Sequence, residues 1–143
     1  MNKKRFFIAF IVVFIFLEAT NYFINNIILS STYQQYSSLF RPMEDMMGKF
    51  WIIYVTDFIW SFFFVFFFIK GYENKGVGEG IRFGIYVGIF FGFVISYQNY
   101  VIYPIEYSLV FKWFVYTLIQ CFILGIVASL IYKPVGIKTT AEV

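Results

Sequence analysis

The chain has 143 residues, of which 61% are hydrophobic, 26% aromatic and only 13% charged, and its formal net charge is +3. Soluble domains are about 45–50% apolar and about 25% charged, so a water-soluble domain of this length could not bury so much apolar surface. The composition therefore predicts an integral membrane protein with a single domain, 1-143, because four spans of about 20 residues leave too few residues for a second one.

The same numbers exclude several functions. Eleven basic and eight acidic residues form no patch dense enough for nucleic-acid binding. The absence of histidine and a single cysteine, Cys121, exclude an internal disulfide, histidine-ligated zinc and histidine-dependent triads. An aspartic protease needs two aspartates, and within the spans only Asp57 is present. We therefore expect no enzymatic activity, no cofactor and no metal.

The first predicted span covers about 6–29 and follows a basic start. Its unbroken apolar run ends at Leu17, and the rest is a mixed stretch that begins with Glu18. This beginning also fits a secretory signal peptide with a cleavage point at Ala19. Because the chain keeps Met1, we expect a retained helix.

The loop 30–49 is long and carries apolar residues among polar ones. Pro42 suits the first turn of a short helix, so the loop is predicted to hold an interfacial segment that lies over the bundle. The methionines of this loop form a thioether cluster, which also suits Cu(I) binding. Interfacial packing is the preferred interpretation, because no further methionine pair or cysteine supports a copper site. The methionines concerned are Met43, Met46 and Met47.

Three more spans are predicted, at about 50–69, 82–103 and 109–132. Pro104 is expected to end the third span, and Pro134 stands just beyond the fourth. The polar, glycine-rich stretch 70–80 predicts a tight connection between the second and third spans. The fold class is thus an all-α membrane protein, a four-transmembrane-helix antiparallel bundle.

Basic residues are distributed unequally over the two sides of this predicted bundle. An excess of lysine and arginine marks cytoplasmic loops, so both termini are predicted to be cytoplasmic. The terminal side carries Lys3, Lys4, Arg5, Lys70, Lys75, Arg82, Lys133 and Lys138, and the other side carries Arg41, Lys49 and Lys112.

Small residues recur every four positions in the third and fourth spans. Such a stripe allows another helix backbone to approach closely. The third span carries Gly80, Gly84, Gly88, Gly92 and Ser96, and the fourth carries Thr117, Cys121, Gly125 and Ser129. We expect these two spans to pack against each other, because a short turn joins them. The alternative is that one stripe faces a second protomer.

Glu18 and Asp57 are the only acidic residues deep inside the spans. At 1.5 Å per residue, both lie about 18 Å from the cytoplasmic helix ends, as does Gln120, and Ser96 lies at about 21 Å. Helical spacing places Asn21 beside Glu18, and Tyr54 beside Asp57. These six residues form a predicted polar layer, within an outward-opening cleft.

Two interpretations of this layer compete. Without a lysine, arginine or histidine nearby, at least one carboxyl group is expected to keep its proton near neutral pH. In the structural interpretation, neutral Glu18 and Asp57 hold the helices together by hydrogen bonds. In the functional interpretation, they bind and release a proton or a small cationic solute.

Three segments resemble small four-helix bacterial membrane proteins of unknown function: KGYENKGVGEGIRFG at 70–84, YPI at 103–105 and LIYKP at 130–134. The resemblance implies a multi-pass protein of the bacterial inner, or cytoplasmic, membrane. The chain also resembles the small multidrug resistance transporters in having a glutamate, Glu18, in the first of four spans, although the supporting pattern of that family is absent. That likeness implies only a proton-linked carboxylate.

Two functions remain at this point. The first is a small non-enzymatic protein that binds or transports a proton or a small cationic solute at the carboxylates. The alternative is an accessory subunit that packs against a larger membrane complex through its glycine stripes. The expected partners are the lipid bilayer and either a second copy of the chain or such a complex.

Overall fold

The computed structural model describes residues 2–132, and this part of the chain is helical, without a β-strand. Four helices are long and apolar enough to cross a membrane, which confirms the predicted fold class at this level. They are α1 (Lys3–Tyr22) with its π-helical continuation Phe23–Ile28, α4 (Phe50–Lys70), α5 (Val77–Ile102) and α6 (Tyr107–Ile131). Lys133, Pro134 and Lys138 lie outside the described residues.

The helices extend beyond the predicted apolar spans at polar ends. The α1 helix begins at Lys3, where the Asn2 side chain accepts a hydrogen bond from the backbone N–H of Arg5 at 3.2 Å. The α5 helix begins at Val77, five residues before the predicted Arg82. Apolar runs in the sequence mark only the part of each helix that suits the membrane core. The first turn of a helix can lie before this part, in the polar interface, where a capping residue marks the start of the helix.

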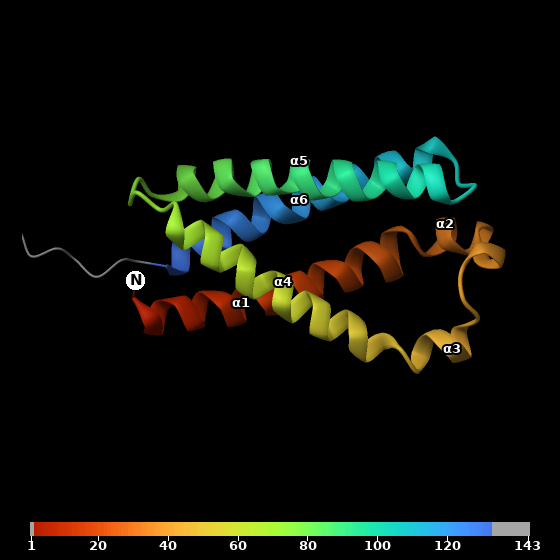
Figure 1. Ribbon diagram of the computed structural model, residues 1–143, viewed down its shortest axis with the longest axis horizontal. Coiled ribbons are helices and arrows are strands. Elements are labelled where there is room, and N and C mark those ends of the chain that lie inside the picture. Colours follow the sequence, from red (N-terminus) through yellow and green to blue (C-terminus); the bar gives the residue numbers. More distant parts are fainter. Residues whose placement is uncertain (1, 133–143) are drawn as a thin grey trace, which may run out of the picture.

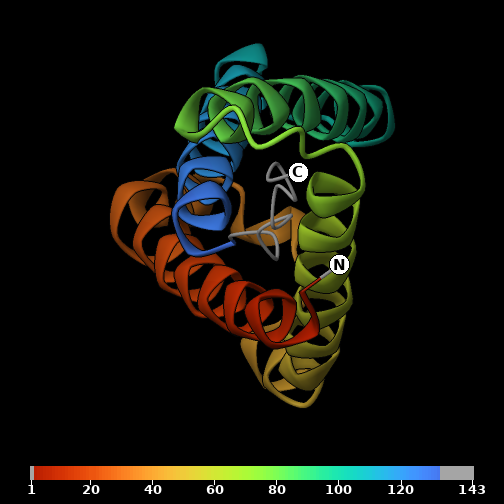
Figure 2. The same ribbon diagram turned by 90° about the vertical axis from the view of Figure 1, so that its left-hand side faces the viewer.

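The four long helices form an open four-sided frame (Figures 1 and 2). The α5 and α6 helices lie side by side and antiparallel, while α1 packs against both α4 and α6. In contrast, α4 and α5 meet through aromatic rings, as in the pairs Trp60–Phe91 and Phe64–Phe83. The first half of α4 diverges from α5, so these two helices are close to each other only near the turn that joins them.

The two ends of the frame differ. The backbone N–H of Asn2 donates to the Tyr132 hydroxyl at 3.3 Å, so the beginning of α1 and the end of α6 meet. The α4–α5 connection lies at this end, which we call the terminal end (Figure 1). The segment 30–49 and the α5–α6 turn lie at the opposite end, called the long-loop end.

The main apolar core lies toward the terminal end, between α1, α4 and α6. Many large apolar side chains on the outer faces are exposed, as expected of helices that face lipid. The core residues are Phe6, Ala9, Val13, Leu17, Phe64, Val65, Phe68, Ile69, Leu124, Ala128 and Tyr132.

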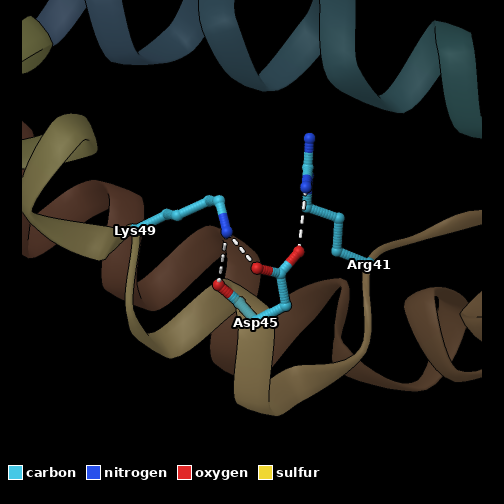
Figure 3. A network of polar contacts seen from close by, with 3 residues as sticks. All are labelled: Arg41, Asp45 and Lys49. Atoms are coloured by element: carbon cyan, nitrogen blue, oxygen red, sulfur yellow. Dashed lines mark hydrogen bonds and ion pairs between the residues drawn. The ribbon is translucent and has the colours of Figure 1, made fainter.

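The segment 30–49 folds into short helical pieces, α2 (Ser30–Gln35), a 3₁₀ turn (Ser37–Leu39) and α3 (Met43–Met47). None of the residues in these pieces is buried. Figure 3 shows that Asp45 of α3 is flanked by Lys49, which contacts its carboxylate, and by Arg41 at 2.8 Å. Lys49 and Arg41 hold the pKa of Asp45 below its usual range, and all three side chains are exposed.

The turn between α4 and α5 is organised by a buried carboxylate. Asn74 and Gly76 have positive φ angles of 63° and 84°, which bend the chain sharply. Glu79, only 6% exposed, accepts hydrogen bonds from the backbone N–H groups of Glu73 at 2.8 Å and Lys75 at 2.7 Å. Glu79, which lies in the first helical turn of α5, therefore fixes the conformation of the connection between α4 and α5.

Replacing Glu79 by alanine is expected to lower the stability of the protein by about 1–3 kcal/mol, because two backbone donors lose a buried acceptor. Thermal unfolding in detergent and amide exchange at positions 73 and 75 measure this. The matched control is Glu73→Ala, which removes an exposed carboxylate of the same turn. Equal thermal midpoints for the two variants would show that Glu79 does not organise the turn.

Candidate functional site

Polar side chains from three helices meet just beyond the apolar core. The Asn21 Nδ2 group of α1 donates to Asp57 Oδ2 of α4 at 2.8 Å. On the other side of Asn21, the Gln120 Nε2 group of α6 donates to Asn21 Oδ1 at 2.8 Å. A continuous chain of hydrogen bonds therefore connects α6, α1 and α4.

Thr20 is a member of this cluster that the sequence analysis missed. Its oxygen accepts a hydrogen bond from Gln120 Nε2 at 2.6 Å, and its own hydroxyl hydrogen faces the Phe16 and Leu17 carbonyl oxygens at 2.8 and 2.9 Å. A threonine inside a helix commonly donates to the carbonyl four residues earlier, which leaves its oxygen free to accept from a neighbouring helix. This hydrogen-bonding pattern is the signal by which Thr20 could have been identified in the sequence.

Glu18 and Asp57 form an acidic pair across the α1–α4 contact. Their carboxyl groups are close enough to interact electrostatically with each other. The Glu18 Oε1 atom is buried and has no hydrogen-bond partner among the described residues. Within residues 2–132, the ion pairs lie in the segment 30–49 and in the turn between α4 and α5. No lysine or arginine of these residues therefore pairs with either carboxyl group. We call Glu18, Thr20, Asn21, Asp57 and Gln120 the polar cluster.

Two residues of the predicted layer, Tyr54 and Ser96, do not join the polar cluster in the structure. Tyr54 of α4 is 56% exposed, and no hydrogen bond within residues 2–132 joins it to the cluster. Ser96 is 2% exposed on α5 and forms no hydrogen bond with the cluster in the described part of the chain. The small-residue face of α5 is directed at α6, so α5 contributes no polar group to the cluster.

A second polar chain leads from α1 to the long-loop end. Asn25 Nδ2 donates to the backbone carbonyl of Asn21 at 2.9 Å, and its Oδ1 accepts from the Tyr33 hydroxyl at 2.8 Å. Trp113 Nε1 in turn donates to that hydroxyl at 2.9 Å. Burial raises the pKa of Tyr33, and the Trp113 hydrogen bond partly opposes this effect. Polar groups thus continue from the cluster toward the long-loop end.

The small residues of α5 and α6 lie face to face. A methyl group on Gly80 would overlap the Gly125 carbonyl oxygen, and one on Gly84 would overlap that of Cys121. At Gly88 the added carbon would lie 2.9 Å from Leu118 Cα. Farther along, the carbon added at Gly92 would lie 3.2 Å from Thr117 Cβ, and Ser129 borders Gly80. The two backbones therefore approach most closely toward the terminal end.

The fold and the site together define a helical protein whose length and composition suit a multi-pass membrane protein, with an acidic cluster between three of its helices. The chain matches no protein-family model, no characterised protein and no solved structure in our comparisons.

Proposed function

We propose that this chain is a small non-enzymatic protein of the bacterial inner membrane that binds a proton or a small cationic solute at Glu18 and Asp57 and carries it across the bilayer. The observation that supports this proposal is the acidic pair itself. Two interacting carboxyl groups lie between apolar helices, and no cation of the described chain pairs with them.

Energetics favour an exchangeable positive partner at this place. A charged side chain at the centre of a bilayer costs about 2.5–3.5 kcal/mol on insertion scales, and two adjacent anions repel each other as well. A bound proton or cation removes part of this cost. The buried, unpartnered Oε1 atom of Glu18 offers such a partner an oxygen ligand.

The surroundings of the pair support access from the long-loop end. On that side, Asn25, Tyr33 and Trp113 extend the polar groups away from the cluster. On the terminal side, the apolar core of α1, α4 and α6 separates the cluster from the helix ends. We therefore propose that the structure represents a state that loads from the long-loop end.

The distribution of basic residues supports an outward position for that end. Within residues 2–132, six basic residues belong to the terminal half: Lys3, Lys4, Arg5, Lys70, Lys75 and Arg82. Three belong to the long-loop half: Arg41, Lys49 and Lys112. Under the positive-inside rule, the terminal end is then cytoplasmic.

The test is a transport measurement on the purified protein in proteoliposomes. Uptake of a fluorescent cation driven by a pH gradient is expected for the parent and is expected to be lost in the double variant Glu18→Gln/Asp57→Asn, which cannot hold a negative charge. The matched control is Glu44→Gln/Asp45→Asn, which makes the same chemical changes in the exposed loop. Equal uptake by both double variants would refute the proposal.

The alternative, an accessory subunit, receives less support from the geometry. It requires glycine stripes that are available to another protein, whereas the stripes of α5 and α6 face each other within one chain. The same geometry gives the glycine stripes no role in forming a homodimer.

A further inference from the structure

Each hydrogen bond of the polar cluster has one possible donor and one possible acceptor. The assignment starts from two backbone carbonyl groups. The carbonyl oxygens of Phe16 and Leu17 can only accept hydrogen bonds. The single hydroxyl hydrogen of Thr20 faces them at 2.8 and 2.9 Å. The Thr20 oxygen must therefore act as an acceptor toward the other helices.

This direction fixes both amide side chains. Gln120 must present its NH₂ group to the Thr20 oxygen, which lies at 2.6 Å, and the Leu17 carbonyl at 3.4 Å also accepts only. The second hydrogen of this NH₂ group is then given to Asn21 Oδ1 at 2.8 Å. Because the oxygen of Asn21 faces Gln120, its nitrogen faces Asp57 and donates to Oδ2 at 2.8 Å.

The two carboxyl groups consequently have unequal surroundings. Asp57 receives an N–H group, which stabilises a carboxylate anion. Glu18 receives no donor at Oε1, and an ionised carboxylate with a buried, unpartnered oxygen is costly. The side chain that hydrogen-bonds to the pair is neutral, since it is the Asn21 amide, and the Gln120 amide and the Thr20 hydroxyl that follow it along the chain of hydrogen bonds are neutral as well. Only one negative charge is therefore favoured, and Asp57 is the better place for it.

We propose that the pair holds one proton, that this proton resides on Glu18 while Asp57 carries the negative charge, and that Asn21 is the positioning residue that creates this difference. The inference rests on the proposed function for its purpose, since it names Glu18 as the group that exchanges the proton. Gln120 and Thr20 act through Asn21, because they hold its amide with the nitrogen toward Asp57.

Infrared spectroscopy of the full chain in lipid vesicles at pH 7 tests where the proton resides. The C=O stretching band of a protonated carboxyl group is expected to shift when the protein carries isotopically labelled glutamate and to stay in place with labelled aspartate. The band is expected to disappear in Glu18→Gln. A band that shifts with labelled aspartate would overturn the proposal, and so would the absence of any protonated band.

The role of Asn21 is tested by a matched pair of variants. Asn21→Leu removes the donor to Asp57, so part of the protonated band is expected to move from the glutamate to the aspartate label. Asn26→Leu makes the same change in the π-helical continuation of α1, where the amide donates to the Tyr22 carbonyl at 3.3 Å and to nothing else within residues 2–132, and is expected to leave the spectrum unchanged. A purely structural role would lower thermal stability without moving the band, and an unchanged spectrum in Asn21→Leu would refute the assignment.

The outcome is separable from that of the transport experiment. The infrared spectrum needs no transport, so a proton on Glu18 in a protein without uptake refutes the proposed function alone. Uptake by a protein whose proton resides on Asp57 refutes the inference alone.

Discussion

Replacing Gly84 by alanine is expected to destabilise the protein by about 1–3 kcal/mol, the usual cost of overpacking. The added methyl carbon would overlap the carbonyl oxygen of Cys121 and would lie 3.0 Å from Phe122 Cα. Both are backbone atoms, so α6 as a whole must move away from α5. The thermal midpoint in detergent measures the effect.

Gly78→Ala is the matched control on the same helix. Apart from the neighbouring backbone of α5 itself, no atom of residues 2–132 lies within 4 Å of a methyl carbon at that position, and alanine favours helix over glycine by up to about 1 kcal/mol. The two substitutions are therefore expected to have opposite signs. If both raise the thermal midpoint, the α5–α6 contact is looser than the structure describes.

The arrangement of α5 and α6 follows from a pattern that the sequence displays directly. A spacing of four keeps small residues on one helical face, and a short turn forces the two helices to be antiparallel neighbours. The position of α4 has no such pattern. Its contacts with α5 depend on the rotamers of Trp60, Phe64 and Phe68, and any large apolar residue at those positions gives the same local signal. The divergence of the first half of α4 was therefore not predictable.

The polar cluster was predictable in depth but not in direction around the helix axis. Counting residues along each helix placed Glu18, Asp57 and Gln120 at one level, because the helical rise is constant. Tyr54 lies three residues before Asp57, which offsets it by roughly 60° around the helix. In the structure, Asp57 bonds to Asn21 of α1, whereas Tyr54 is 56% exposed.

Replacing Asp57 by alanine is expected to destabilise the protein by about 1–3 kcal/mol, whereas Asp57→Asn is expected to stay close to the parent. Alanine removes the acceptor of the Asn21 N–H group, which is part-buried. Asparagine can turn its amide oxygen toward Asn21 and preserve that hydrogen bond. Thermal unfolding of the two variants in detergent measures the difference.

Asp45→Ala is the control, because it removes an aspartate whose ion pairs are solvent-exposed and are expected to contribute little. Stability and uptake together then separate the two roles of Asp57. A variant Asp57→Asn that is as stable as the parent but has reduced uptake assigns the negative charge to transport and the hydrogen bond to the fold. If Asp57→Asn unfolds as readily as Asp57→Ala, the charge itself holds α1 and α4 together, and the carboxylate is a structural element.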